Sequence, residues 1–405
     1  MEWKEVRLGD VCEIKGGKRL PKGVNLITQK NSHPYIRVRD LGKSKTIELN
    51  SSYEYVDEIT QKQIQRYITQ KGDILISIVG TIGLIAIVGG SLDGANLTEN
   101  CVKLVKLDKI DSEYLYYYLK SPFGQQNISR GTVGAVQAKL PIKNIQDFSI
   151  ICPELISDQR RIASILSSLD RKIELNNKIN ADLEEMAQAI FKNWFVDFEP
   201  FKDGKFVDSE LGMIPEGWKV GTLGDITKNK SAKVKERNDV KVLSPVTTGE
   251  LVLSEEYFTK QVFSSSIAKY KIVNKGDFAY NPARVNIGSL GRNEFDFDGC
   301  VSPVYVVFSV LDGYEHYFDL FRKTDFFKDS VASLAIGGVR QSLSYDDLSS
   351  IEVIIPSENA VEEFNNLYNQ MKKTIKANKL ENSRLSLLRD TLLPRLMSGE
   401  LEVPE

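Results

Sequence analysis

Apolar residues recur with an alternating four- and three-residue spacing through one long, otherwise polar segment. The positions in this seam are Ile162, Leu166, Leu169, Ile173, Asn176, Asn180, Leu183, Ala187, Ile190 and Trp194. This period places all of them on one helix face, as in a coiled-coil seam. It predicts a long helix over 158–196, of about 55 Å between Asp158 and Trp194. Only the two central positions carry amides.

The same seam occurs again 202 residues later and predicts a second long helix over 358–398. Its positions are Phe364, Tyr368, Met371, Ile375, Asn378, Asn382, Leu385, Arg389, Leu392 and Leu396. We expect the two helices to pair. Asparagine at a seam position lowers stability but fixes register, because a slipped pairing would bury amides against leucine.

The direction of pairing is left open by this spacing. Antiparallel pairing about the seam midpoint would oppose Asn176 to Asn382 and Asn180 to Asn378. Parallel pairing in register would also set amide against amide. The asparagines therefore exclude sliding, but they do not choose a direction.

Shorter motifs repeat as well. "WKEVRLGD" at Trp3 returns as "WKVGTLGD" at Trp218, and "KGDILIS" at Lys71 returns as "KGDFAYN" at Lys275. A glycine-containing stretch that ends at Pro153 returns as one that ends at Pro356. Repeats on this scale indicate two similar structural units.

Strand-like stretches such as "ILISIVG" and "CVKLVKL", with short helices expected at "SEYLYYYLKS" and "YFDLFRKTDFFKDSV", indicate mixed α/β units. The predicted fold class is α+β: two β-rich mixed α/β domains separated by two long paired helices, with a pseudo-twofold internal repeat. The domains are 1–157 and 217–357, with a linker over 197–216 and a C-terminal tail over 399–405.

Bulk composition excludes several classes of protein. The 405 residues are 41% hydrophobic and 27% charged, as in soluble globular proteins. Four cysteines without a C-x-x-C pair and only two histidines argue against a disulfide framework, a zinc cluster or histidine catalysis. We find no signal-peptide pattern and no apolar run long enough for a membrane span, so we expect a cytoplasmic protein that does not bind membranes.

Charge is uneven although the net charge is −2. Residues 1–50 carry eleven Lys and Arg against six Asp and Glu, and residues 228–241 carry six basic residues against two acidic ones. Localised basic loops on a near-neutral chain are compatible with local DNA contacts, and equally with solvated surface lysines.

Several of these stretches resemble the specificity subunit of type I restriction-modification enzymes. They are "DQRRIASILSSLDRKIELNNKINADLEEMAQAIFKNWFVDFEPF" (158–201), "LRDTLLPRLMSGEL" (388–401) and "SELGMIPEGWKVGTLGD" (209–225), together with the repeated "LGD" and "KGD" motifs. The resemblance covers essentially the whole chain.

The resemblance implies that each domain is a target recognition domain reading one half of a bipartite, asymmetric site in double-stranded DNA. The helices would then pack antiparallel, set the spacer between the half-sites and dock two modification (methyltransferase) subunits. No cofactor is expected in this chain. S-adenosylmethionine, ATP and Mg would belong to the modification and restriction (motor-nuclease) subunits.

The chain offers little catalytic chemistry of its own. "NPAR" at Asn281 has Arg284 where adenine methyltransferases have an aromatic residue, and no phosphate-binding G-x-x-x-x-G-K-[ST] loop occurs. Asp296 and Asp298 alternate beside a glycine and are more typical of a surface turn than of a metal site. We therefore predict no catalytic residue and no metal ligand. Two alternatives remain: a stand-alone DNA-binding scaffold or regulator, and a solitary methyltransferase, which the missing motifs disfavour.

The candidate site residues are therefore DNA contacts. Arginine reads guanine, asparagine and glutamine read adenine, and lysine holds phosphates. In the first domain the candidates are Lys15, Lys18, Arg19, Lys22, Arg37, Arg39, Thr81, Arg130 and Gln137. In the second they are Lys233, Lys235, Arg237, Asn281, Arg284, Asn286, Arg292, Arg340 and Gln341.

Overall fold

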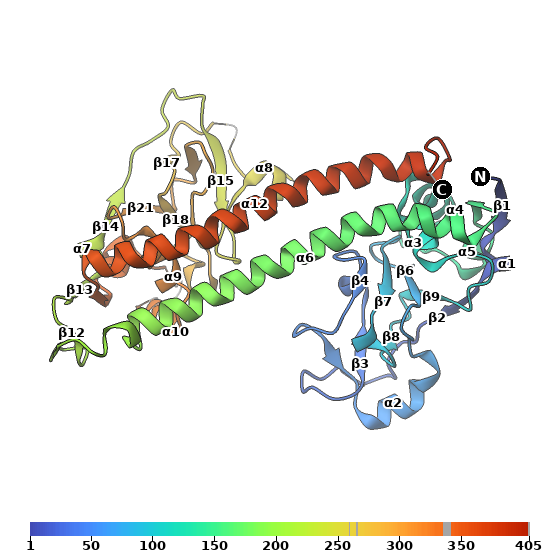
Figure 1. The fold of residues 1–405 in the computed structure, drawn as a ribbon, viewed down its shortest axis with the longest axis horizontal. Coiled ribbons are helices and arrows are strands. Elements are labelled where there is room, and N and C mark those ends of the chain that lie inside the picture. The colour runs from blue at the N-terminus through green and yellow to red at the C-terminus, as the bar shows by residue number, and fades with distance from the viewer. Residues whose placement is uncertain (259, 265, 335–341, 404–405) are drawn as a thin grey trace. The chain divides into compact units, whose positions relative to one another are not determined.

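The chain folds into two compact units. The structure is a computed structural model that describes residues 1–258, 260–264, 266–334 and 342–403. Unit 1 comprises Met1–Lys178 and Asn378–Glu405, and unit 2 comprises Ile179–Ala377 (Figure 1). The long helices α6 (Ile156–Phe195) and α12 (Glu358–Met397) each contribute one part to either unit.

Unit 1 is built on a mixed five-stranded sheet in the order β2-β9-β6-β7-β4, beside a three-stranded sheet β5-β3-β8 and an antiparallel pair β1-β10. The strands are β1 (Trp3–Arg7), β2 (Glu13–Gly16), β3 (Pro34–Ile36), β4 (Thr46–Ile47), β5 (Glu54–Tyr55), β6 (Ile74–Ser77), β7 (Ile85–Val88), β8 (Asn96–Leu97), β9 (Cys101–Val105) and β10 (Ser149–Pro153). The short helices are α1 (Leu8–Val11), α2 (Glu58–Ile64), α3 (Ser112–Lys120), α4 (Pro122–Gly131) and α5 (Ile142–Gln146).

Unit 2 has two four-stranded sheets, β14-β21-β18-β19 and β16-β15-β20-β17, with the pairs β13-β22 and β11-β12. The strands are β11 (Phe206–Val207), β12 (Ile214–Pro215), β13 (Lys219–Thr222), β14 (Thr227–Lys230), β15 (Lys241–Pro245), β16 (Leu251–Leu253), β17 (Lys271–Val273), β18 (Phe278–Tyr280), β19 (Leu290–Arg292), β20 (Gly299–Val301), β21 (Val306–Val310) and β22 (Glu352–Ile355). The short helices are α7 (Leu223–Ile226), α8 (Ser254–Tyr257), α9 (Glu315–Phe321), α10 (Asp325–Leu334) and α11 (Tyr345–Ser349).

The two units share one strand order. The sequence β2-β9-β6-β7 in unit 1 corresponds to β14-β21-β18-β19 in unit 2, and in each unit the opening strand pairs with the closing one, β1 with β10 and β13 with β22. The predicted fold class, two mixed α/β units with long helices and an internal repeat, is confirmed.

Continuous apolar runs form the central strands because both of their faces are buried. On β6, Ile74 and Ile76 face a core shared with α3 and α6, whereas Leu75 faces a second core against the small sheet. On β18, Phe278 and Tyr280 face one core and Ala279 faces the other. The repeated hydrophobic pattern thus produces the same two-core arrangement twice.

The repeated "KGD" motif is a turn that starts the central strand of each unit. The carboxylate of Asp73 accepts a hydrogen bond from the Gln70 amide at 2.9 Å, and that of Asp277 accepts one from the Asn274 amide at 2.9 Å. Gly72 and Gly276 have φ values of 89° and 90°, a left-handed conformation that favours glycine. The motif is therefore structural.

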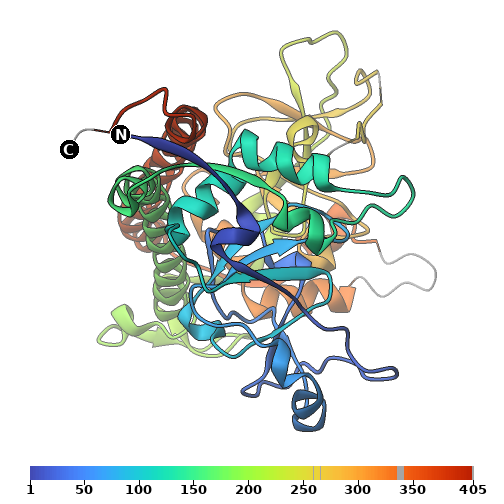
Figure 2. The same ribbon diagram turned by 90° about the vertical axis from the view of Figure 1, so that its right-hand side faces the viewer.

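Within unit 1, the first part of α6 lies beside the last part of α12 (Figure 2). Asp170 of α6 binds Arg389 of α12 at 2.7 Å, and Asn176 of α6 binds Asn382 of α12 at 2.9 Å. Numbering rises along one helix as it falls along the other, so this pairing is antiparallel. In unit 2, Phe191 and Phe195 of α6 pack against Phe364 of α12, with ring centroids 6.2 and 5.0 Å away.

Two local predictions need correction. The first long helix begins at Ile156 rather than at Asp158, and Asp158 lies in its first turn, where it binds Arg161 at 2.6 Å. The stretch "YFDLFRKTDFFKDSV" forms two helices because α9 ends at Phe321 and α10 begins at Asp325. The hydroxyl of Thr324 accepts the Phe327 amide at 3.2 Å at that start.

Candidate nucleic-acid interface

Several loops of unit 1 meet at one end of its five-stranded sheet. Strands β2 and β6 end there and β9 begins there, since Gly16 pairs with Val102 and Ser77 pairs with Cys101. The segments that follow β2, follow β6 and precede β9 therefore share this end. Four of the nine DNA candidates of the first domain, Lys18, Arg19, Lys22 and Thr81, lie on these segments.

The loop after β6 is joined to the glycine-containing loop after α4. The Leu140 amide donates to the Ile78 carbonyl at 3.0 Å, and Val79 forms a bridge with Lys139. Thr81 lies in the first loop and Gln137 in the second, and both are exposed. Arg130, at the end of α4, is exposed where the second loop begins. The structure thus brings these sequence-distant candidates onto adjoining loops.

The segment after β2 carries Lys18, Arg19 and Lys22. Lys18 is tied to the sheet end by its amide, which donates to the Leu97 carbonyl at 2.8 Å. Arg19 binds Glu99 at 2.7 Å while its side chain stays 81% exposed. Although partial burial acts in the opposite direction, Arg19 and neighbouring donors lower the pKa of Glu99. Lys22 is exposed in a turn.

Lys15 differs because it lies within β2 and binds Glu13 at 2.9 Å. Arg37 and Arg39 converge on a single carboxylate, Glu54 of β5, which Arg39 contacts at 2.8 Å. The side chain of Arg37 is only 27% exposed, whereas that of Arg39 is 53% exposed. Glu54 partly neutralises both arginines and holds them in place.

Unit 2 repeats this loop arrangement at the corresponding sheet end. Strand β14 ends with Lys230 opposite Val307, and β18 ends with Tyr280 opposite Val306. The Leu343 amide donates to the Pro282 carbonyl at 3.1 Å, the counterpart of the bond that joins the two loops of unit 1. Arg340 and Gln341 precede Leu343 but lie outside the described residues.

The loop after β18 holds Asn281, Arg284 and Asn286. Asn281 shapes this loop, since its side-chain oxygen accepts the Ala283 amide at 3.1 Å and its own amide donates to the Ser289 carbonyl at 3.1 Å. Arg284 and Asn286 are exposed. Of the three, Arg284 alone carries a positive charge, and its side chain is exposed to a ligand.

The segment after β14 carries Lys233, Lys235 and Arg237. Both lysines are exposed. Arg237 forms a bidentate pair with Asp239, at 2.9 and 2.6 Å, and also reaches Asp298 at 3.1 Å. These carboxylates raise the pKa of Arg237 and compete with any phosphate for its donors.

Arg292 lies apart from the other candidates, at the opposite end of the sheet. It is paired with Phe278, the first residue of β18, and its guanidinium lies over that ring, 5.8 Å from the centroid. It also contacts Nδ1 of His316 at 3.2 Å. These packing contacts give Arg292 a structural role in unit 2.

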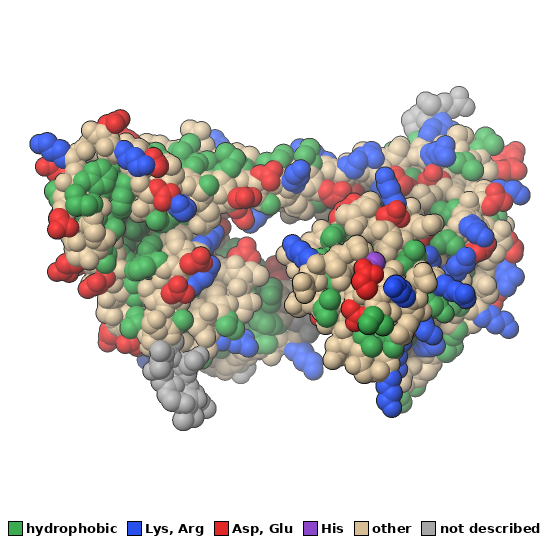
Figure 3. Space-filling view, turned by 90° about the horizontal axis from the view of Figure 1, so that it is seen from below, with side chains coloured by type: hydrophobic (Ala, Val, Ile, Leu, Met, Phe, Trp, Pro, Cys, Tyr) green, Lys and Arg blue, Asp and Glu red, His purple; other side chains and the backbone are tan. Residues whose placement is uncertain are grey.

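Basic and acidic side chains are mixed on the surface of unit 1. On the face seen in Figure 3, Lys and Arg side chains are spread over the unit that carries α2, with carboxylates among them. A surface of mixed sign does not neutralise phosphates broadly, so DNA contacts would be confined to the loops.

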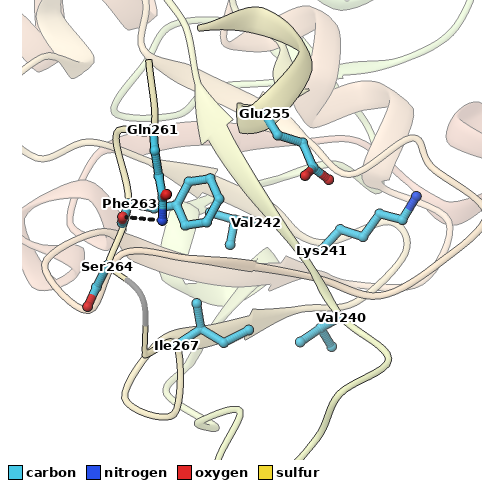
Figure 4. A pocket seen from close by; sticks show the side chains of 8 residues that line it. All are labelled: Val240, Lys241, Val242, Glu255, Gln261, Phe263, Ser264 and Ile267. Carbon is cyan, nitrogen blue, oxygen red and sulfur yellow. Dashed lines mark hydrogen bonds between the residues drawn. The ribbon is translucent and has the colours of Figure 1, made fainter. Parts of the chain in front are cut away.

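A shallow hollow of about 270 Å³ lies beside β15 in unit 2 (Figure 4), next to the segment that carries Lys233 and Lys235. Its lining includes Val240, Val242, Phe263 and Ile267, with Lys241 and Glu255 at its edge. Within the described residues, no group of histidine, cysteine and carboxylate side chains could hold a metal ion. Among them, too, no helix is long and apolar enough to cross a membrane.

Two of the four seam asparagines, Asn176 and Asn382, form a polar centre in the helix pair of unit 1. Nδ2 of Asn176 donates to Asn382 at 2.9 Å and to Glu381 at 2.7 Å, and Asn382 donates to Asn177 at 2.8 Å. The Asn176 amide and the Lys172 ammonium lower the pKa of Glu381. Asn180 is buried in unit 2, and Asn378 belongs to unit 1.

The acidic partners of the candidate arginines were not predicted from the sequence. Glu54, Glu99 and Asp298 hold candidate arginines, yet each lies 15 or more residues away from its partner along the chain. Such ion pairs can be predicted from the sequence only when it is already known which strands pair with each other.

Comparisons with known proteins identify relatives of this chain. Residues 1–185 match the family described as "Type I restriction modification DNA specificity domain". The chain is 27% identical over its whole length to the type I restriction enzyme MjaIX specificity subunit of Methanocaldococcus jannaschii, covering 94% of that protein. It is 26% identical to the HindI specificity subunit of Haemophilus influenzae, covering 65% of this chain and 71% of that one.

A solved structure shares the fold. The type I restriction-modification S subunit from M. genitalium superposes with a TM-score of 0.58 at 18% identity, covering 98% of this chain and 96% of that one. The repeated units, the paired helices and a relative that aligns over the whole chain make this protein similar, from end to end, to the type I restriction-modification specificity subunits.

Proposed function

We propose that this chain is the DNA sequence-specificity subunit of a type I restriction-modification complex. Residues 1–157 and 217–357 act as two target recognition domains, each reading one half of a bipartite, asymmetric site in double-stranded DNA. The chain recognises DNA and leaves catalysis to its partners.

One observation carries the proposal: the same set of loops is assembled twice, at the same end of two equivalent sheets. The bonds from Leu140 to Ile78 and from Leu343 to Pro282 join equivalent loops in the two units. Exposed cations lie on these loops, Lys22 and Arg130 in one unit and Lys233, Lys235 and Arg284 in the other. Such cations can bind phosphates and base edges, and different loop sequences can read different half-sites.

The helix pair supports a role in assembly. In unit 1 it exposes large apolar side chains, with Leu175 51%, Leu387 71% and Leu388 47% exposed. Exposed leucines on a rigid helix pair are suited to protein contacts. We propose that the helices dock two modification subunits, which bind S-adenosylmethionine, and that restriction subunits bring ATP- and Mg-dependent chemistry.

Reconstitution tests this function. The purified chain incubated with DNA and S-adenosylmethionine should transfer no methyl group, and addition of its modification subunits should give methylation at one bipartite sequence. Methyl transfer by the chain alone would overturn the proposal. If the chain bound a specific DNA sequence but never associated with modification subunits, the stand-alone DNA-binding scaffold would be the better description.

A further inference from the structure

One ion pair between the long helices is absent from the internal repeat. Asp170 of α6 is held by Arg389 of α12 at 2.7 Å and by the hydroxyl of Tyr117 at 2.6 Å, and its side chain is only 10% exposed. At the offset of 202 residues, Lys372 stands in the place of Asp170 and Ala187 in that of Arg389. The seam is therefore repeated, whereas its buried charge pair is not.

This unrepeated ion pair matters because α6 could also pair with the α6 of a second chain, and α12 with the α12 of a second chain. In a pairing of α6 with another α6, Asp170 would face Ala187 and would lose its guanidinium. In a pairing of α12 with another α12, Arg389 would face Lys372, whose ammonium already binds Glu294 in unit 2. A buried carboxylate without its cation is strongly disfavoured.

The asparagines at the centre of the seam would tolerate such self-pairing. The asparagines occupy equivalent positions in both helices, so α6 against α6 would still set amide against amide. A second ion pair between the helices in unit 1, Lys172 with Glu381 at 3.2 Å, is 44% exposed on both sides and contributes little selectivity. Among these polar contacts of the seam, selectivity therefore falls on Asp170 and Arg389.

We propose that the Asp170–Arg389 pair makes α6 pair with α12 instead of with the α6 of a second chain. It likewise makes α12 pair with α6 instead of with the α12 of a second chain. The selection concerns assembly and does not depend on which DNA the chain reads. Removing one partner of a buried ion pair strongly destabilises the charge that remains. The population of mixed pairs, α6 with α12, should therefore exceed the population of self-pairs at least about a hundredfold.

The test uses the full chain, cut after folding. The β11–β12 hairpin is exposed over residues 210–213, so a protease site between Glu210 and Leu211 would separate the halves. Isotopically heavy and light samples are mixed in urea, refolded by dilution and weighed by native mass spectrometry. Wild-type fragments should form only mixed pairs of N-terminal with C-terminal fragment, with self-pairs near 1% or less.

The decisive variant is Asp170→Leu with Arg389→Leu in a Tyr117→Phe background, which removes the hydroxyl that would lose its acceptor. Its mixed pairs should persist, and self-pairs should rise at least about tenfold. The matched control is Lys172→Thr, which introduces the residue found at the equivalent position 374 and should leave selection unchanged. Abundant self-pairs in the wild type, or no rise in the variant, would overturn the proposal.

If the fragments fail to refold, a second measurement on the uncut chain tests the proposal. In the uncut chain with Tyr117→Phe, Asp170→Leu and Arg389→Leu should each lower the melting temperature, because each leaves the other charge unpaired in the seam. The double replacement should recover most of the loss. Single replacements without any loss would remove the physical basis of the selection.

Discussion

At the scale of single residues, the candidate arginines differ in what already holds them. Arg284 is exposed on the loop after β18, whereas Arg292 packs against Phe278 and contacts His316. An arginine whose guanidinium is occupied by the protein stabilises the fold first. An exposed arginine on an interface loop is available to DNA.

Replacing Arg284 by alanine should weaken DNA binding by the assembled complex by about 1–3 kcal/mol and relax recognition at one base pair. The melting temperature should hardly change, since the side chain is exposed. Arg292→Ala is the matched control and should lower the melting temperature without changing the recognised bases. The measurements are fluorescence anisotropy with cognate DNA and differential scanning calorimetry. The reverse pattern would contradict this assignment.

A buried carboxyl beside the candidate arginines gives a pH-dependent prediction. Burial, opposed by Arg39 and Lys43, raises the pKa of Asp40 to about 6. Because the folded-state pKa lies above the unfolded one, the stability from this group is present below about pH 4 and is lost as pH rises through 6. Asp40→Asn imitates the protonated form and should leave stability unchanged near pH 4 but raise it at pH 7.

Urea unfolding of both proteins between pH 4 and pH 8 would measure the difference. The gap in unfolding free energy should open between pH 4 and pH 6 and stay constant above that range. A variant less stable than the wild type at pH 7 would show that the Asp40 carboxylate stabilises the fold.

Residue types at the interface could be predicted from the sequence, but their availability could not. Basic loops and the loop residues Thr81 and Gln137 were identifiable from charge and repeats. That Arg37 and Arg39 share Glu54 follows from β3 pairing with β5. Charges that meet only through strand pairing leave no local signal in the sequence.

At the scale of elements, the seam asparagines explain how the helices keep one register. Asn176 bonds to Asn382 and Glu381 in unit 1, while its own side-chain oxygen is buried without a partner in the described part of the chain. A buried amide whose hydrogen bonds are incomplete lowers the stability of the helix pair. The asparagines are therefore consistent with a role in fixing the register of the two helices and not in strengthening their packing.

Replacing Asn176, Asn180, Asn378 and Asn382 with leucine should therefore keep or raise the melting temperature and loosen the register. A shift of one heptad moves a helix by about 10 Å, or roughly 3 bp of DNA rise, so sites with altered spacers should become methylated. Sequencing of methylated motifs measures the spacer. An unchanged spacer with a lower melting temperature would assign these amides to another role, such as docking of partners.

Helices were predicted better than sheets, for a physical reason. Seam periodicity is local, so it indicated both long helices to within a few residues of α6 and α12. Sheet order is not local, since β9 lies between β2 and β6 although nearly ninety residues separate Glu13 from Cys101. The repeated "KGD" turns marked where a strand begins in each unit, but not which strand it pairs with.

At the scale of the whole molecule, the near-neutral chain should bind DNA through few phosphates. Binding by the assembled complex should weaken as salt rises, with a slope set by the loop cations of the two units. Combined replacement of Lys233 and Lys235 by alanine should lower that slope by up to about 2 and weaken all sequences alike. Titration across a salt series measures it, and an unchanged slope would remove these lysines from the interface.

The proposed function requires the two units to read separate half-sites. The repeated loop arrangement at two equivalent sheet ends is its structural basis, and the domain limits 1–157 and 217–357 define what to exchange.

The most direct test replaces residues 1–157 with the corresponding domain of another family member and maps methylated motifs in DNA from cells that express the whole complex. One half of the motif should change to that of the donor, while the other half and the spacer length stay the same. A change in both halves, or in neither, would contradict independent reading by the two units.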